Sequence, residues 1–298
     1  MDISKFKSLF RNRRDQDIGE VFAHFHPTRD SLKNELDFDA PFTQIAKHTF
    51  EGESAWYFTS KRFEDKHKNK PPKLRNYLNY TFIRLRDLEL EFPEKYFSCV
   101  SDWVCFNTGL QDPHGSDLYA IFQRYFPPKD SGPAKPAAEW VYKGIATARE
   151  ESFRRHFGRN IPDLAWYSSD SRDYIFNTQY SLETEVFDHM FERAKQRSGF
   201  AADASDEAVR NYLRGAIENI VPKIKRNYKT AIPMYYVEEK RMQLLLPFHS
   251  SNGKDTACFL VERDDINCLY RIKTVLDMDQ AFFAARLITR PDKEWLNP

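Results

Sequence analysis

The chain has 298 residues, a net charge of +1 and 30% charged residues. This near-neutral balance excludes a histone-like, strongly basic binder, although it leaves room for a local basic groove. No stretch approaches the roughly 20 apolar residues of a bilayer span, and no apolar run follows the N-terminus. A cytoplasmic protein without a membrane span is therefore expected. The length allows one large domain or two ordinary ones.

Residues 1–41 are predicted to be an N-terminal extension of a domain that spans residues 42–298. Four apolar residues share one side of a predicted short basic helix: Ile3, Phe6, Leu9 and Phe10. Such a helix either packs on the body of the protein or contacts a membrane or a protein partner.

The region that follows is predicted to be mixed α and β. "FTQIAKHTF" is typical of a short helix and "AWYFTS" of a strand, and residues 74–92 have the apolar spacing of a longer helix. "YFSCVSDWVCFNTGL" indicates two strands with a turn at Ser101 and Asp102. A helix followed by a hairpin resembles the end of a winged-helix module. "DLYAIFQRYF" is predicted to be a helix.

The proline-rich segment 127–139 is the clearest loop and is predicted to divide the domain into two lobes. "WVYKGIAT", directly after it, is predicted to be a strand. "YSLETEVFDHMFERAKQRSGF" fits either a strand that enters a loop or a helix.

The last third of the chain is predicted to be a helix, an antiparallel β-meander and a final helix. The first helix has its apolar face at Val209, Leu213, Ile217, Ile220 and Ile224. Pro222 is expected to kink or restart it, because proline lacks an amide donor. Four strands follow: "AIPMYYV", "RMQLLLPF", "TACFLVE" and "CLYRIKTV". Asp277 is expected to cap the last helix. The fold class is therefore α+β, with a C-terminal meander packed by helices.

The segment "PKIKRNYKTAIPMYY", residues 222–236, is unusually basic and aromatic. Basic residues at the end of a helix complement its negative pole, but one or two suffice for that role. Lys225, Arg226, Asn227 and Lys229 could instead bind phosphate or read a base. Strand alternation is expected to leave Tyr235 on the open side of the sheet, as a platform on which a base can stack.

Three further groups of residues complete the predicted RNA- or nucleotide-binding site. An upstream echo, "PKLRNY", offers Arg75 and Asn76, whose plain reading is solvated charge and polarity on a helix. Asn107 belongs to the set as well. Arg286 and Arg290, near the C-terminus, either reach the rim of the sheet or form ordinary salt bridges.

Other chemistry is less well supported. Four cysteines, Cys99, Cys105, Cys258 and Cys268, form no CxxC pair and are expected to be buried, so no zinc site is predicted. The spacing of His24 and His26 suits a metal, but no third ligand is evident. His114 lies in a turn and could act as an acid or base. No phosphate-binding loop, dinucleotide fingerprint or hydrolase motif occurs.

Several strings together carry a family resemblance: "LRNYLNYTFIRL", "VCFNTGL" with "LYAIF", "RNYKTAIPMYY", "LLLPF" and "LDMDQAFFAARLITRPDKEWL". From Phe42 to Leu296 the chain resembles a mainly bacterial domain family of unknown function. Some members of that family are fused to LOTUS-type RNA-binding or NYN/PIN-type ribonuclease domains. The resemblance implies a context of RNA metabolism, with no reaction, cofactor or catalytic residue to carry over.

The expected function is thus RNA or nucleotide binding through a basic and aromatic cleft. The alternative is an enzyme that processes RNA ends or nucleotides, with Glu262 or His114 moving a proton. A third hypothesis is a structural or partner-binding protein.

Overall fold

The structure is a computed structural model, and the chain in it divides into two compact units, Met1–Ala165 and Trp166–Pro298. It describes residues 1–11, 17–26, 28–30, 35–37, 39–58, 71–126, 138–184, 187–197, 200, 204–249 and 255–288. The boundary does not fall near 127–139, because the strands on either side of that segment pair with each other inside the first unit. Most of that segment, 127–137, lies outside the described residues.

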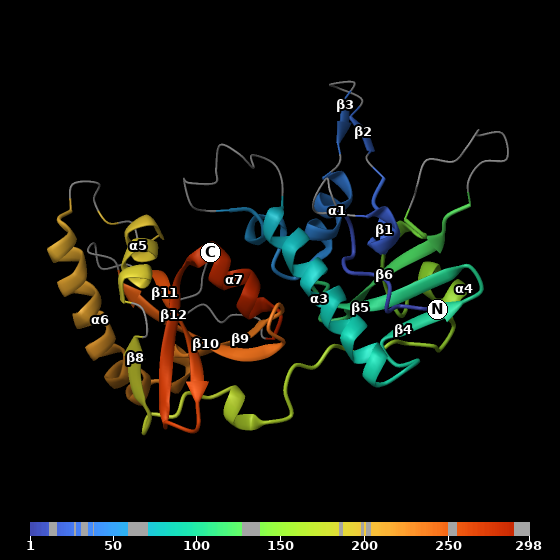
Figure 1. Ribbon diagram of the computed structural model, residues 1–298. Helices are drawn as coiled ribbons and strands as arrows, with labels where there is room; N and C mark the ends of the chain where they lie inside the picture. Colours follow the sequence, from blue (N-terminus) through green and yellow to red (C-terminus); the bar gives the residue numbers. More distant parts are fainter. Residues whose placement is uncertain are drawn as a thin grey trace. The chain divides into compact units, whose positions relative to one another are not determined.

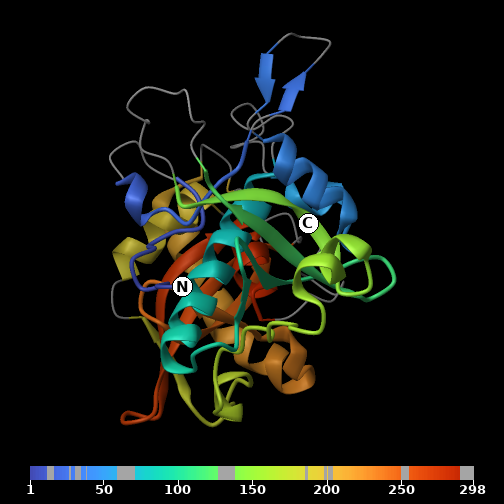
Figure 2. The ribbon, with the colours of Figure 1, turned by 90° about the vertical axis from the view of Figure 1, so that its right-hand side faces the viewer.

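The first unit is built on a five-stranded sheet with the order β1-β7-β6-β5-β4. Its strands are β1 (Ala23–His24), β4 (Phe97–Val100), β5 (Trp103–Gln111), β6 (Asp117–Arg124) and β7 (Trp140–Thr147). All neighbours are antiparallel except β1 and β7. Two further strands, β2 (Thr28–Asp30) and β3 (Glu35–Asp37), form a separate hairpin. Figure 1 labels β1, β4, β5 and β6 of this sheet, and Figure 2 shows the ribbon turned by 90°.

Helices cover both faces of this sheet. Besides α1 (Ala40–His48), the unit has α3 (Pro72–Glu91) and the short α4 (Glu151–Phe157). On one face Phe82 of α3 packs against Phe106 of β5, with ring centroids 5.9 Å apart. The residue before Phe106 on β5, Cys105, points to the other face because side chains alternate along a strand. Cys105 accordingly clusters with Phe153 and Phe157 of α4.

The N-terminal segment is part of this core and not an extension. Phe6 and Phe22 are fully buried, and their rings make an edge-to-face contact at 5.2 Å. Ser8 pairs with Val21 as an isolated bridge, and the rest of the segment consists of turns and bends where a helix was predicted. All four apolar residues of the predicted helix are buried, which confirms packing on the body. Their side chains are therefore not exposed to a membrane or a partner.

Two other predictions for this unit were wrong. The segment predicted as a helix, "DLYAIFQRYF", contains β6, since its apolar residues fill both faces of a buried strand. Ala55 and Trp56 belong to a 3-10 helix and not to a strand. The helix and hairpin of the winged-helix analogy are present, but the hairpin β4–β5 continues into the five-stranded sheet.

His24 links β1 to the chain before β7 through a hydrogen bond that only its neutral ring can accept. Its Nε2 accepts a hydrogen bond of 2.8 Å from the backbone N–H of Ala138. Burial and the nearby His26 lower the pKa of His24 below its usual value of about 6.5. The bond needs a neutral ring, so its contribution is present above the unfolded-state pKa and is lost as the pH falls below about 6.5.

We expect the first unit to be less stable at pH 5 than at pH 7.5, and His24→Gln to reduce that difference. Glutamine keeps an acceptor but does not titrate. Hydrogen exchange of the β7 amides, measured at both pH values, checks this. His114→Gln, at an exposed turn of the same unit, is the matched control. An unchanged pH dependence in His24→Gln would contradict the assignment.

The second unit contains the predicted antiparallel meander. Its five strands are β8 (Ser181–Thr184), β9 (Ile232–Tyr236), β10 (Arg241–His249), β11 (Asp255–Asp264) and β12 (Leu269–Asp277). Their order is β8-β12-β11-β10-β9, and β9 to β12 are paired in antiparallel fashion, as predicted. The sequence did not reveal that β8 pairs with β12 in parallel.

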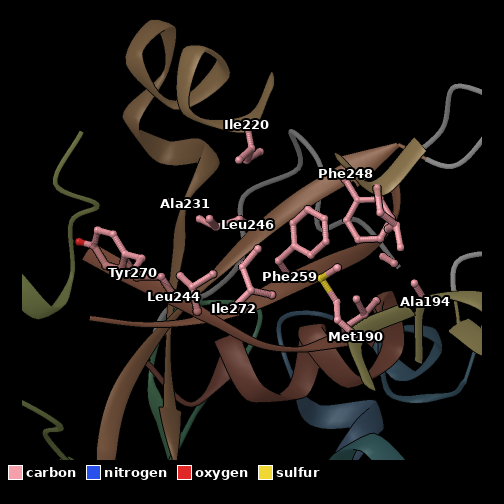
Figure 3. Close-up of a cluster of buried hydrophobic side chains, with 14 of the residues drawn as sticks. Met190, Ala194, Ile220, Ala231, Leu244, Leu246, Phe248, Phe259, Tyr270 and Ile272 are labelled. Atoms are coloured by element: carbon pink, nitrogen blue, oxygen red, sulfur yellow. The ribbon is translucent and has the colours of Figure 1, made fainter. Parts of the chain in front are cut away.

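Helices lie on both faces of this sheet as well: α5 (Phe187–Arg197), α6 (Asp206–Arg226) and α7 (Met278–Arg286). Figure 3 shows the core on the first face, where Met190 of α5 and Ile220 of α6 lie over Leu246 and Phe259 of the sheet. Leu245, one residue along β10, faces the opposite side and is fully buried. That side is covered by α7, which contacts β9, β11 and β12.

The helix boundaries follow the predicted capping pattern. Asp277 caps α7, and its carboxylate accepts a 2.8 Å hydrogen bond from the Gln280 N–H. Ser205 caps α6 in the same way. Pro222 lies inside α6, which continues past it to Arg226 without a restart. Of the helices that the structure describes, none combines the length and apolar character needed to cross a bilayer.

Candidate nucleic-acid interface

The basic segment lies where α6 ends. The helix stops at Asn227, whose N–H donates to the Lys223 carbonyl at 3.1 Å. The Asn227 side chain then accepts a 3.1 Å bond from the Lys229 N–H and starts a 3-10 helix, Tyr228–Thr230. Thr230 is buried and holds this turn on the unit. Lys225, Arg226, Tyr228 and Lys229, called here the basic turn, are thus presented by a fixed backbone.

The side chains of the basic turn are exposed. Tyr228 is 64% exposed, which is unusual for a large ring. Within the described residues, no acidic side chain forms an ion pair with Lys225 or Arg226. Cations at this position complement the helix dipole, and their charge also attracts polyanions. An exposed phenol among cations is the combination on which a base stacks while its phosphate is neutralised.

Tyr235, predicted to be the stacking platform, is not available. Its ring is 3% exposed and packs against Tyr167, with centroids 5.1 Å apart. The expectation failed because both faces of the sheet are covered in this unit, so strand alternation leaves no open side at β9. Tyr228, just before the strand, is the exposed ring. Arg286 is 7% exposed on α7, and Arg290 lies outside the described residues.

The upstream residues Arg75 and Asn76 belong to the first unit, and Arg75 is engaged in its packing. Arg75 forms a 2.9 Å ion pair with Asp39, and its guanidinium lies over the rings of Phe10 and Phe42. Asn76 is exposed on α3. That the upstream and downstream basic segments meet in one cleft stays a prediction.

Asn107 is likewise not open to a ligand. It is 2% exposed, and its amide donates to the Asp117 carboxylate at 3.1 Å. Its side-chain oxygen accepts a 2.9 Å bond from the Gly109 N–H. Asn107 therefore shapes the irregular end of the β5–β6 ladder.

A pocket of about 560 Å³, which the sequence did not reveal, lies between α4 and the strands β5, β6 and β7. Trp103 and His156 stack on each other at its edge, with ring centroids 3.7 Å apart and an interplanar angle of 21°. Lys143 and Arg155 are exposed at its rim. Burial and the neighbouring Arg155 lower the pKa of His156. Trp103 and His156 are more than 50 positions apart in the sequence, so no local motif could have revealed the pocket.

Several acidic residues of the second unit are held in ion pairs. Glu262 pairs with Arg241 and lies 3.8 Å from Lys273. Arg263 binds Asp173 at 2.9 Å and Asp265 at 3.0 Å. These contacts line a polar pocket of about 360 Å³. Glu262, the predicted proton donor of the enzyme alternative, is thus placed between two cations.

Two neighbouring carboxyls are stabilised as anions. A side-chain hydrogen bond from Arg172, with its N–H, lowers the pKa of Asp170 to about 2. Bonds from the Asn267 side chain and from Arg271 lower the pKa of Asp264 to about 2. Groups with such pKa values do not exchange protons near neutral pH. This network therefore ties the chain before β8 to the β11–β12 hairpin.

The other candidate chemistry is weaker in the structure than in the sequence. The Nε2 atom of His24 already accepts a backbone hydrogen bond, and the part of the chain that is described holds no metal-ligand cluster. His114 is exposed in a turn closed by Asp112, which accepts from the N–H groups of His114 and Ser116. Cys105 and Cys258 are buried as expected, whereas Cys99 and Cys268 are exposed.

A comparison with family models matches residues 47–295 to a domain of unknown function, DUF3825. The chain belongs to the DUF3825 family. The matched residues include most of the first unit and nearly all of the second, so the match covers every strand of the two five-stranded sheets except β1. Searches of curated proteins and of solved structures found no match.

Proposed function

We propose that this DUF3825 protein is a cytoplasmic RNA-binding protein of RNA metabolism that binds single-stranded RNA through the basic turn. The observation that carries the proposal is the exposed group formed by Lys225, Arg226, Tyr228 and Lys229 at the end of α6. The chain resembles a family in which some members are fused to LOTUS-type RNA-binding or NYN/PIN-type ribonuclease domains. This resemblance supports a role in RNA metabolism.

The chemistry of the basic turn suits a flexible single strand more than a duplex. The lysines and the arginine neutralise phosphates, and Arg226 can donate two parallel hydrogen bonds to one phosphate. The Tyr228 ring offers a face on which any base can stack, for about 1–3 kcal/mol per base. A site of this kind binds with little sequence preference and weakens as salt is added.

The double variant Lys225→Ala, Arg226→Ala is expected to weaken binding of a short single-stranded RNA by about tenfold or more at low salt. Removing two phosphate contacts should also reduce the slope of log affinity against log salt by about 1.4. Fluorescence anisotropy with a labelled oligonucleotide, at several salt concentrations, measures both quantities.

The matched control is Arg154→Ala with Arg214→Ala, which removes the same charge from exposed positions on α4 and α6. It should change the affinity less than twofold, by analogy with other surface charges. Equal losses in the two double variants, or affinity without salt dependence, would remove the basic turn as the RNA contact. Tyr228→Ser should weaken binding, while Tyr228→Phe keeps the stacking face and should not.

A further inference from the structure

The pocket beside α4 lies where this helix is too short to cover its face of the sheet. The helix has only seven residues, and Phe153 and Phe157 anchor it over Cys105 and Tyr119. The neighbouring part of the sheet, around Ile121 and Gly144, is left as the floor of a pocket of about 560 Å³. This volume is in the range of pockets that hold small organic ligands.

The wall of the pocket is aromatic. Trp103, from the start of β5, and His156, from the end of α4, stack nearly parallel at 3.7 Å. Both side chains are half-buried and line the pocket, so the pair is reachable from it. A stacked pair presents π-faces to which a further planar ring can add. The wall therefore selects flat, aromatic ligands.

The rim of the pocket is cationic. Lys143, at the irregularity between β6 and β7, and Arg155, on α4, both line it and are exposed. Neither forms an ion pair with an acidic residue in the described ranges. Glu151 is the acidic residue among the pocket-lining positions, so the rim has a net charge of +1 from two cations and one carboxylate. An anionic group is favoured beside the aromatic wall.

We infer that this pocket binds a nucleoside monophosphate, with the base on the Trp103–His156 stack and the phosphate between Lys143 and Arg155. A planar ring and an anion joined by a small spacer are the two features that the wall and the rim select. The inference is independent of the basic turn, because the two sets of residues belong to different units.

Titration calorimetry of the full-length protein with adenosine monophosphate and uridine monophosphate tests the inference. Adenosine and inorganic phosphate are the reference probes. We expect saturable binding of the nucleotides, and at least tenfold weaker binding of each reference probe, because each lacks one of the two recognised groups. Lys143→Ala with Arg155→Ala should weaken nucleotide binding by about tenfold or more. Arg154→Ala, at the adjacent exposed position of α4, is the control and should bind as the parent does.

The location is checked by NMR, through the indole N–H signal of Trp103 and its assignment with Trp103→Phe. Nucleotide should shift that signal in the parent and in Arg154→Ala. The inference is overturned if nucleotide gives no saturable binding at millimolar concentration, if the Trp103 signal does not move, or if Arg154→Ala loses as much affinity as the rim variant. Adenosine binding as tightly as its phosphate would also overturn it. The variants of the RNA-binding test leave Trp103, His156, Lys143 and Arg155 unchanged. The two proposals can therefore fail separately.

Discussion

Phe82→Ala is expected to destabilise the first unit by about 3–5 kcal/mol, the usual cost of deleting a large buried ring. Phe82 is fully buried, and its ring lies 4.9 Å from Phe22, 5.9 Å from Phe97 and 5.9 Å from Phe106, measured between centroids. It therefore joins α3 to the N-terminal segment and to two strands. The surrounding rings are large and cannot collapse fully into the space that it leaves.

The measurement should report on this unit alone, because a chain of two units need not unfold in one step. Hydrogen exchange of the β5 and β6 amides, with peptides resolved by mass spectrometry, gives the free energy of opening locally. Phe92→Ala is the control, since Phe92 is 39% exposed just beyond the end of the same helix. We expect it to cost less than about 1 kcal/mol. Similar losses at both positions would show that Phe82 is not central to the core.

Gly109→Ala is expected to cost about 2–4 kcal/mol, for two separate reasons. Gly109 has φ of +72°, a conformation in which an alanine costs roughly 1–2 kcal/mol. In addition, an added Cβ would lie 2.6 Å from the hydroxyl oxygen of Tyr77. That buried hydroxyl donates a 2.9 Å hydrogen bond to the Thr108 carbonyl and must move, which adds about 1–2 kcal/mol.

Gly115→Ala separates the backbone cost from the cost of the contact with the Tyr77 hydroxyl. Gly115 has φ of +80°, but no atom lies within 4 Å of its added Cβ, so only the backbone cost applies. A double-mutant cycle with Tyr77→Phe then isolates the contact, because phenylalanine lacks the oxygen that the new methyl meets. We expect Gly109→Ala to cost about 1 kcal/mol less in the Tyr77→Phe background. Hydrogen exchange of the β5 and β6 amides measures each variant, as for Phe82→Ala, and a coupling energy near zero would contradict the predicted contact.

The two proposed nucleic-acid contacts use one kind of chemistry in two different ways. The basic turn is exposed, and it suits a polymer whose phosphates can follow a surface. The pocket near Trp103 is enclosed on one side, and it suits a single nucleotide. Parallel experiments on the two sets of residues show whether the DUF3825 domain has an RNA contact, a nucleotide site or both.

Local sequence patterns predicted the structure correctly where a segment buries one side and leaves the other side polar. The spacing of Val209, Leu213 and Ile220 specifies a helix with one buried face, and the structure has that helix with those residues buried. Alternation along Tyr270, Arg271 and Ile272 predicts a strand with a buried and a polar side, and in β12 Tyr270 and Ile272 are buried while Arg271 is partly exposed. The cap at Asp277 depends on residues within one turn, so it could be read directly.

Sequence patterns failed where a segment is buried on both sides, because its apolar and polar residues then no longer alternate. The residues of β6, from Leu118 to Phe122, are all buried, and a continuous apolar run does not distinguish a helix from a central strand. The N-terminal segment was separated from the domain because its partners, such as Phe82, lie far along the chain. Tyr235 was placed on an open face because the sequence does not say that helices cover both sides of the sheet.

The amino-acid sequence by itself determined the α+β class, the C-terminal meander with its capping helix, and the basic turn after α6. These features depend on interactions within a few residues, and short periods in the sequence record such interactions. Only the tertiary structure decided that the N-terminus belongs to the core, that Arg75, Asn107 and Tyr235 are used in packing, and that Trp103 meets His156 beside Lys143. Those outcomes depend on side chains brought together from distant positions, and burial on folding, which no local pattern encodes, selects among the alternatives.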